Sequence, residues 1–238
     1  SFIKDDYKNN EKDNIKINIA KEKDKNFKVE AFIKSENNSI NSNELSSYIK
    51  NNNITLENQE IIFGSINQIE FTLNKKNEIK NLILKSNLNL QNILIKYKSP
   101  RLNKIFPDYK NTIKIKDILI NIDFSKNKKN FFINGNYSFN DDYDKFNFKL
   151  LNNERDLTFD SNIEIIDSQI ILEDINYKKK KNKFSEIKLN GQIFENKKIK
   201  FKNISLIEND NNFSLSNLYL SNNYKIIGFD KLQLIYLN

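Results

Sequence analysis

The sequence of 238 residues contains no cysteine, histidine, methionine or tryptophan, and has only two prolines and four glycines. Without cysteine there is no disulfide framework and no thiolate chemistry. Without histidine and cysteine, zinc sites and Ser-His-Asp or Cys-His relays cannot be built in their usual forms. The glycines Gly64, Gly135, Gly191 and Gly228 are isolated, so there is no glycine-rich phosphate loop. These absences argue against an enzyme.

Apolar residues are scarce as well. They make up 38% of the chain, below the ~45–50% typical of globular domains, and the mean hydropathy is -0.69. No apolar run approaches the ~18–20 residues of a membrane span, and no signal peptide is visible. The apolar residues that are present are mainly Ile, Leu, Phe and Tyr, most of which favour strands. A compact two-layer sandwich of this size usually has more to bury.

The net charge of +8 comes from 39 basic and 31 acidic residues. A nucleic acid or an anionic membrane could use such a surplus, but the lysines are scattered, as expected for the solvated faces of strands. The aromatic residues form no RNP-like cluster, so we expect no nucleic-acid partner. We interpret the run Lys178–Lys181, with Lys183 just after it, as solvated charge at a hairpin tip. Contact with lipid phosphates is the alternative.

Acidic pairs are the remaining candidates for metal or acid–base chemistry. Asp5-Asp6, Asp141-Asp142 and Glu173-Asp174 fall at expected strand ends or turns. No spacing typical of metal ligands links them. We therefore expect no catalytic residue, no metal site and no cofactor.

The clearest positive signal is the alternation in Phe131–Phe139. Phe131, Ile133, Tyr137 and Phe139 occupy every second position, with Gly135 in the empty slot. This spacing predicts a β-strand with one apolar face and one polar face. A near copy follows at Ile187–Phe194, where Ile187, Leu189 and Ile193 alternate around Gly191.

The same pattern, with short turns rich in Asn, Asp and Lys, repeats along most of the chain and predicts well over a dozen antiparallel strands. Two stretches interrupt it. Ser42–Lys50 has Leu45, Tyr48 and Ile49 at helical spacing, and Ser99 is an expected N-cap before Pro100. Residues 98–109 are a candidate seam between an N-terminal half (1–97) and a C-terminal half (110–238).

So many strands exceed what one open twisted sheet normally holds without curling. We expect an all-β fold, a long curled antiparallel sheet that forms an apolar groove, with one or two short helices. The alternative is a closed β-sandwich whose two apolar faces pack on each other. For the groove, the predicted lining residues are Phe131, Ile133, Tyr137, Phe139, Phe146, Phe148, Ile163, Ile187, Leu189 and Ile193.

Several segments also carry a family resemblance. They are Ile113–Ile122, FFINGNY at 131–137, INY at 175–177, SEIKLNG at 185–191 and LSNLYL at 215–220. On these, the run from Phe106 to Asn238 resembles the C-terminal AsmA-like region of the YhdP group in the AsmA/TamB superfamily. The first half is similar more loosely, through EFTLNKK at 70–76 and through Ile79–Leu90.

The resemblance implies a periplasmic segment of a large envelope protein of Gram-negative bacteria, anchored in the inner membrane. Such a protein extends as a groove of repeated β units and is linked to phospholipid movement toward the outer membrane. The expected ligands are phospholipid acyl chains, and membrane contact is expected through other parts of the parent chain. Because the sequence begins at Ser1 and has no Met, we expect a single piece of that longer protein. A structural or adhesive β-sandwich repeat without a ligand is the alternative function.

Overall fold

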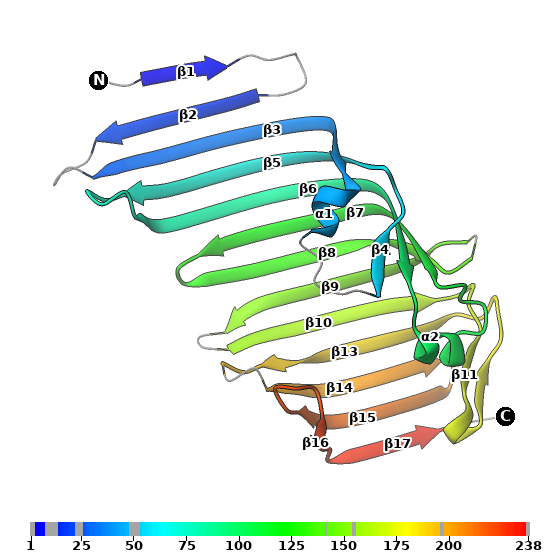
Figure 1. The fold of residues 1–238 in the computed structure, drawn as a ribbon. Coiled ribbons are helices and arrows are strands. Elements are labelled where there is room, and N and C mark those ends of the chain that lie inside the picture. Colours follow the sequence, from blue (N-terminus) through cyan, green and yellow to red (C-terminus); the bar gives the residue numbers. More distant parts are fainter. Residues whose placement is uncertain are drawn as a thin grey trace.

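The fold was described from a computed structural model, which covers residues 3–7, 14–21, 26–47, 53–140, 142–153, 156–195 and 198–236. Within these residues the molecule is one 15-stranded antiparallel sheet, a separate two-stranded sheet and two short α-helices (Figure 1). The large sheet is open and curled. The prediction of an all-β fold with a long antiparallel sheet is confirmed, and a sandwich of two large sheets is not what the chain forms.

The large sheet is an up-and-down meander in which almost every strand pairs with the next one along the chain. Its path contains β1 (Ile3–Tyr7), β2 (Asn14–Lys21), β3 (Phe27–Asn41), β5 (Glu60–Leu73), β6 (Ile79–Tyr97), β7 (Thr112–Ser125), β8 (Lys128–Ser138), β9 (Asp144–Asn153), β10 (Asp156–Ile165), β13 (Ser185–Ile193), β14 (Ile199–Glu208), β15 (Asn211–Leu220) and β16 (Ile226–Gly228). Off this path, β4 (Ile54–Leu56) pairs with β6, and β17 (Lys231–Ile235) pairs with β15. The small sheet is the hairpin β11 (Ile170–Leu172) and β12 (Tyr177–Lys179), inserted between β10 and β13.

Several strands are longer than the sequence pattern predicts, because β-bulges interrupt the alternation without ending the strand. Ile113–Ile115 and Ile118–Phe124 belong to one strand, β7, whose register with β8 shifts between Lys116 and Leu119. Asp117 lies there with φ 53°. The extra residue returns the apolar side chains to the same face.

Asparagine occupies other positions of this kind. Asn37 in β3 and Asn81 in β6 also have positive φ, at register shifts with β5. None of the glycines has positive φ. Asn tolerates the left-handed region better than other non-glycine residues, so a chain with four glycines can still build its bulges.

The helices start close to where their caps predict. The Ser99 side chain accepts a hydrogen bond from the backbone N–H of Leu102 at 3.2 Å, and α2 (Pro100–Ile105) has Pro100 in its first turn. The first helix, α1 (Ser42–Ser46), is capped by Asn41 and is shorter than the predicted Ser42–Lys50. Residues 48–50, which include Tyr48 and Ile49, lie outside the described part of the chain.

The segment around residues 98–109 does not divide the sheet. β6 and β7, on either side of it, are hydrogen-bonded neighbours from Leu84 to Lys96. α2 and the connection that follows it leave the ends of these strands and fold over the sheet (Figure 1). The two predicted halves are therefore parts of one continuous sheet.

The alternation of Ile175 and Tyr177 in the sequence predicts a strand over 175–177, and this prediction is wrong in part. A short 3-10 turn, η2 (Glu173–Ile175), ends at Asn176 in the left-handed conformation with φ 50°, and only Tyr177 belongs to a strand. This turn reverses the chain between β11 and β12 so that the hairpin can fold over the sheet.

Candidate functional site

One face of the large sheet, here called the inner face, carries the apolar side chains of successive strands. Residues directly opposite each other in an antiparallel pair point to the same side, so the register identifies this face. One row across it reads Ser65, Leu88, Ile120, Ile133, Phe148, Ser161, Leu189, Ile204, Leu215 and Leu232. All but the two serines are large and apolar.

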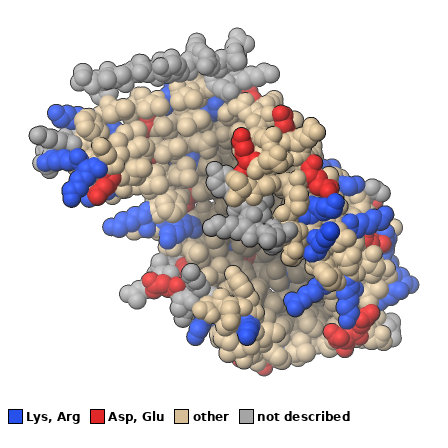
Figure 2. All heavy atoms as spheres, viewed as in Figure 1, with Lys and Arg blue, Asp and Glu red and all other residues tan. Residues whose placement is uncertain are grey.

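Charge is confined to the edges of this face. From β2 to β17, the charged side chains of described residues that the register places on it are Lys21, Lys129, Asp144 and Glu208, and each lies at a strand end. Figure 2 shows lysines and arginines gathered toward the two ends of the strands, while the hollowed surface between them is mostly uncharged. The inner face is therefore an uncharged, apolar trough with charged rims.

The opposite, outer face carries the polar half of the alternation. Lys28 forms ion pairs there with Glu30 at 2.8 Å and with Glu70 at 3.0 Å, and Lys188 pairs with Glu186 at 2.6 Å. The same pairing with two carboxylates raises the pKa of Lys28. These exposed pairs keep the outer face hydrated and add little to stability.

Nine of the ten predicted lining residues share the inner face, as the register shows, and Phe139 follows the end of β8. Ile133 lies opposite Phe148, Ile163 lies opposite both Phe146 and Ile187, and Ile193 lies opposite Leu157. Six of the ten lie outside the cluster that the described residues form at one end of the sheet: Phe131, Ile133, Phe146, Phe148, Leu189 and Ile193.

The other four predicted residues belong to a packed end of the sheet. Phe139, Ile163 and Ile187 pack against a buried cluster of Phe106, Tyr109, Ile165, Ile170, Tyr177 and Leu206. The Phe139 ring lies 5.0 Å from the ring of Phe106 and 5.4 Å from that of Tyr137, centroid to centroid. The Tyr137 hydroxyl donates to the backbone carbonyl of Glu164 at 2.8 Å. α2 and the β11–β12 hairpin cover this end, here called the capped end.

Two glycines allow aromatic rings to lie flat against the inner face. Gly135 is directly opposite Phe146, and Gly191 is directly opposite Phe159. A Cβ atom added to Gly191 would lie 2.6 Å from Cζ of Phe159, and one added to Gly135 would lie 3.1 Å from Cε1 of Phe146. The empty slots in the sequence pattern are thus filled by rings from the neighbouring strand.

The capped end is held by buried polar contacts. The Tyr177 hydroxyl donates to a Glu208 carboxylate oxygen at 2.8 Å. Lys179 is fully buried, and its Nζ donates to the backbone carbonyls of Ser168 at 2.7 Å, Ile166 at 3.0 Å and Lys180 at 3.3 Å. The interpretation of the lysine run as solvated charge is therefore wrong for Lys179, although Lys178, Lys180 and Lys181 are exposed.

Burial dominates the electrostatics at the capped end. It lowers the pKa of Lys179, an effect partly offset by nearby Asp144. It raises the pKa of Asp144, whose carboxylate accepts from the Ile166 N–H at 3.0 Å. The pKa values of Tyr137 and Tyr177 are also raised by burial, and for Tyr177 the bond to Glu208 adds to the effect.

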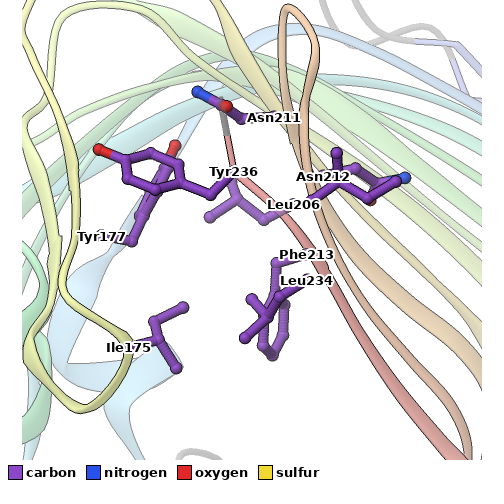
Figure 3. A pocket seen from close by; sticks show the side chains of 9 residues that line it. Ile175, Tyr177, Leu206, Asn211, Asn212, Phe213, Leu234 and Tyr236 are labelled. Atoms are coloured by element: carbon purple, nitrogen blue, oxygen red, sulfur yellow. The ribbon is translucent and has the colours of Figure 1, made fainter. Parts of the chain in front are cut away.

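A small cavity lies between the hairpin and the sheet at this end (Figure 3). Its volume is about 60 Å³, and Ile175 and Tyr177 face Leu206, Phe213, Leu234 and Tyr236 across it. Pockets for drug-sized ligands measure ~300–1,000 Å³. The cavity is a packing gap and is too small to hold an acyl chain.

The trough continues beyond the capped end toward both edges of the sheet. Its side chains there are open to solvent: Ile17 on β2 is 40% exposed, and Leu232 and Leu234 on β17 are each 48% exposed. The sequence pattern already predicted these strands as one-sided, but no residue of the N-terminal half was included among the predicted lining. The same period of two would have identified Ile69 and Leu88 in that half, and Ile120 in the other.

Sequence reasoning also missed a line of polar groups on the inner face of β3, β5 and β6. The Ser86 hydroxyl donates to Asn67 Oδ1 at 2.6 Å, and Asn67 Nδ2 donates to Ser65 Oγ at 2.9 Å. On β3, Asn38 Nδ2 donates to Ser35 Oγ at 2.7 Å. Their positions in the alternation, in slots otherwise filled by Ile, Leu or Phe, are the signal that could have identified them.

Nothing in the described part of the chain forms a metal site, because no group of three or more acidic side chains comes close enough together to hold an ion. None of the described helices is long and apolar enough to cross a membrane.

Comparisons of the chain with family models, with curated proteins and with solved structures find no match. The geometry of the inner face is accordingly the main basis for a functional proposal.

Proposed function

We propose that this chain binds phospholipid acyl chains along the inner face of its sheet and conducts them between membranes. The observation that carries the proposal is the part of the inner face that no described element covers, which is apolar and uncharged between its rims. The largest apolar patch on a typical soluble monomer measures ~300–600 Å² and often marks a binding site. An apolar trough that is longer than such a patch matches a ligand that is itself apolar and extended.

The dimensions of the trough suit acyl chains. Strands in a sheet are spaced by ~4.8 Å, and thirteen strands lie along the main path. The trough thus extends over roughly 60 Å of sheet. One leaflet of a bilayer holds its acyl chains within roughly 15 Å, half of the hydrocarbon core. Several chains could therefore lie along the face in sequence, as transport along a groove requires.

The energetics need no chemical step. Keeping one CH₂ group out of water is worth ~0.8 kcal/mol, so an apolar trough lowers the barrier for a chain that leaves a membrane. The polar head groups would stay hydrated at the rims, where charged side chains such as Lys129 lie.

The resemblance to the AsmA-like region of the YhdP group supports the cellular setting of this proposal. It implies a periplasmic location, within a longer protein anchored in the inner membrane, with phospholipid passing toward the outer membrane. The fold class that this resemblance implies agrees with the open sheet.

A structural or adhesive repeat is the competing proposal, and it requires no ligand. Native mass spectrometry of the chain purified gently from a Gram-negative host separates the two. Lipid transport predicts adducts of phospholipid mass that are lost in Ile133→Asp. A bare mass at every condition, with no binding of a dye for exposed apolar surface, would favour the structural repeat.

A further inference from the structure

Among the described residues of β3, β5 and β6, a group of polar side chains interrupts the apolar surface of the inner face. Ser35, Ser65, Asn67 and Ser86 lie side by side across β3, β5 and β6: Ser35 is directly opposite Ser65, and Asn67 is directly opposite Ser86. Their same-face neighbours are apolar, since Ser65 also faces Leu88. A polar group in apolar surroundings carries a cost unless it is hydrogen-bonded.

The hydrogen bonds within this group all lead toward the oxygen atoms of Ser35 and Ser65. Ser86 donates to Asn67, Asn67 donates to Ser65, and separately Asn38 donates to Ser35. Both Ser35 and Ser65 therefore act as acceptors through their oxygen atoms. No acceptor for either hydroxyl hydrogen is found within the described part of the chain.

The two serines are positioned to act together. Directly opposite residues of an antiparallel pair have Cβ atoms ~5 Å apart. Both side chains are half-buried, so they are open to a ligand in the trough. A carbonyl oxygen has two lone pairs and can accept two hydrogen bonds. The pair of hydroxyl groups matches one such oxygen.

The surroundings determine the charge of that acceptor. No lysine or arginine lies on this part of the inner face among the described residues. A phosphate there would lack a cationic partner and would have to shed much of its hydration. An uncharged carbonyl carries no such penalty.

We infer that Ser35 and Ser65 form a carbonyl-binding subsite in the trough, which holds an ester carbonyl of a diacyl lipid through two hydroxyl donors. Asn67 and Ser86 position Ser65 by orienting its hydroxyl. The inference rests on the proposed function, and it adds that ester-linked lipids are recognised at a fixed point along the sheet. Acyl chains then extend from this point over the apolar face on both sides.

The test compares two soluble lipids with identical head groups and chain lengths, dioctanoylphosphatidylcholine and its dialkyl ether analogue, which lacks both carbonyls. Their dissociation constants are measured by calorimetric titration of the full chain. We expect the ester lipid to bind about three- to tenfold more tightly, as one or two net hydrogen bonds would give. In the double variant Ser35→Ala/Ser65→Ala, the two lipids should bind within about twofold of each other.

Ser39→Ala is the matched control, because Ser39 lies on β3 on the outer face, opposite Ile62. It should keep the preference of the unmodified chain. Equal binding of the two lipids by the unmodified chain would overturn the subsite and leave the proposed function standing. An ester preference that survives the double variant would also overturn it, and would leave the serines with only a structural role at the β3 bulge. Failure of both lipids to bind would overturn the proposed function and the subsite together.

Discussion

The ring of Phe159 lies over Gly191 on the neighbouring strand, so closely that a Cβ atom at residue 191 would be 2.6 Å from Cζ of that ring. The same atom would be 2.1 Å from the backbone carbonyl oxygen of Lys200 on the other side. Gly191 sits where the register of β13 and β14 shifts. Three strands therefore meet at a point that leaves no room for a side chain.

We predict that Gly191→Ala destabilises the protein by ~1–3 kcal/mol, because a backbone atom and a packed ring must both move. Gly228→Ala is the control, since nothing lies within 4 Å of the added atom. It should change the free energy of unfolding by less than ~0.5 kcal/mol. Denaturant unfolding of both variants measures the difference. Equal stabilities would show that the contact at Gly191 is not as tight as described.

A second prediction concerns the buried lysine at the capped end. Lys179→Met should lower the free energy of unfolding by about 3 kcal/mol, because backbone carbonyls of Ile166 and Ser168 lose a charged donor. Lys180→Met, at an exposed neighbouring position, should stay within ~0.5 kcal/mol of the unmodified chain. Thermal unfolding of the two variants is the measurement. A Lys179→Met protein as stable as the control would contradict the role given to its hydrogen bonds.

A third prediction is loss of stability in alkali. The pKa values of Tyr137 and Tyr177 are raised by burial, so both stay protonated in the folded chain after their unfolded counterparts ionise near pH ~10. Above that pH the folded state binds more protons, and stability therefore falls as pH rises.

Each tyrosine contributes about 1.4 kcal/mol per pH unit to that decline. Tyr137→Phe and Tyr177→Phe should each reduce the slope between pH ~10 and ~11 by this amount. Denaturant unfolding at a series of pH values measures the slope. The slope is the informative quantity, because Tyr177→Phe also removes the donor to Glu208 and shifts stability at every pH.

A fourth prediction tests the trough by placing a negative charge on the inner or the outer face of the same strand, in β8 and in β13. Ile133→Asp and Leu189→Asp put a carboxylate on the inner face and should weaken phospholipid binding at least tenfold, because burying an unpaired charge beside an acyl chain costs more than ~1.4 kcal/mol. Asn134→Asp and Asn190→Asp put the same charge on the outer face of the same strands.

These outer-face variants should bind lipid within about twofold of the unmodified chain. Lys180→Ala, which removes an exposed positive charge, should likewise have little effect. Circular dichroism of all variants checks that the sheet is intact. Equal loss of binding from both faces would exclude the trough as the binding surface.

The sequence predicts the inner face well where alternation is unbroken. In the strands around Phe131 and Leu189, the direction of each side chain depends only on its parity, which is a local property of a β-strand. Ser99 and Pro100 likewise predict the start of α2, because a cap is made within one turn. For these elements no tertiary information is needed.

The sequence predicts less where contacts between distant segments determine the local structure. Asp117 looks like the end of one strand and the start of another, but it forms a bulge because β7 pairs with β6 and β8 on both sides of it. Nothing local separates Lys179 from Lys178 or Lys180. Its burial follows from the fold of the β11–β12 hairpin, which brings the carbonyls of Ile166 and Ser168 to it. The local sequence cannot predict the pairing of Ser35 with Ser65 either, since the two serines are 30 residues apart in the sequence.

The central claim, that the inner face holds acyl chains, is tested most directly by site-specific photocrosslinking in β9. Benzoylphenylalanine is placed at position 148 in one protein and at position 149 in another, so that neighbouring residues present the same probe to opposite faces. Each protein is irradiated with phospholipid vesicles and analysed for a mass increase equal to one lipid. The account predicts lipid adducts at position 148 and none above background at position 149. Adducts of equal yield at both positions, or at position 149 alone, would contradict it.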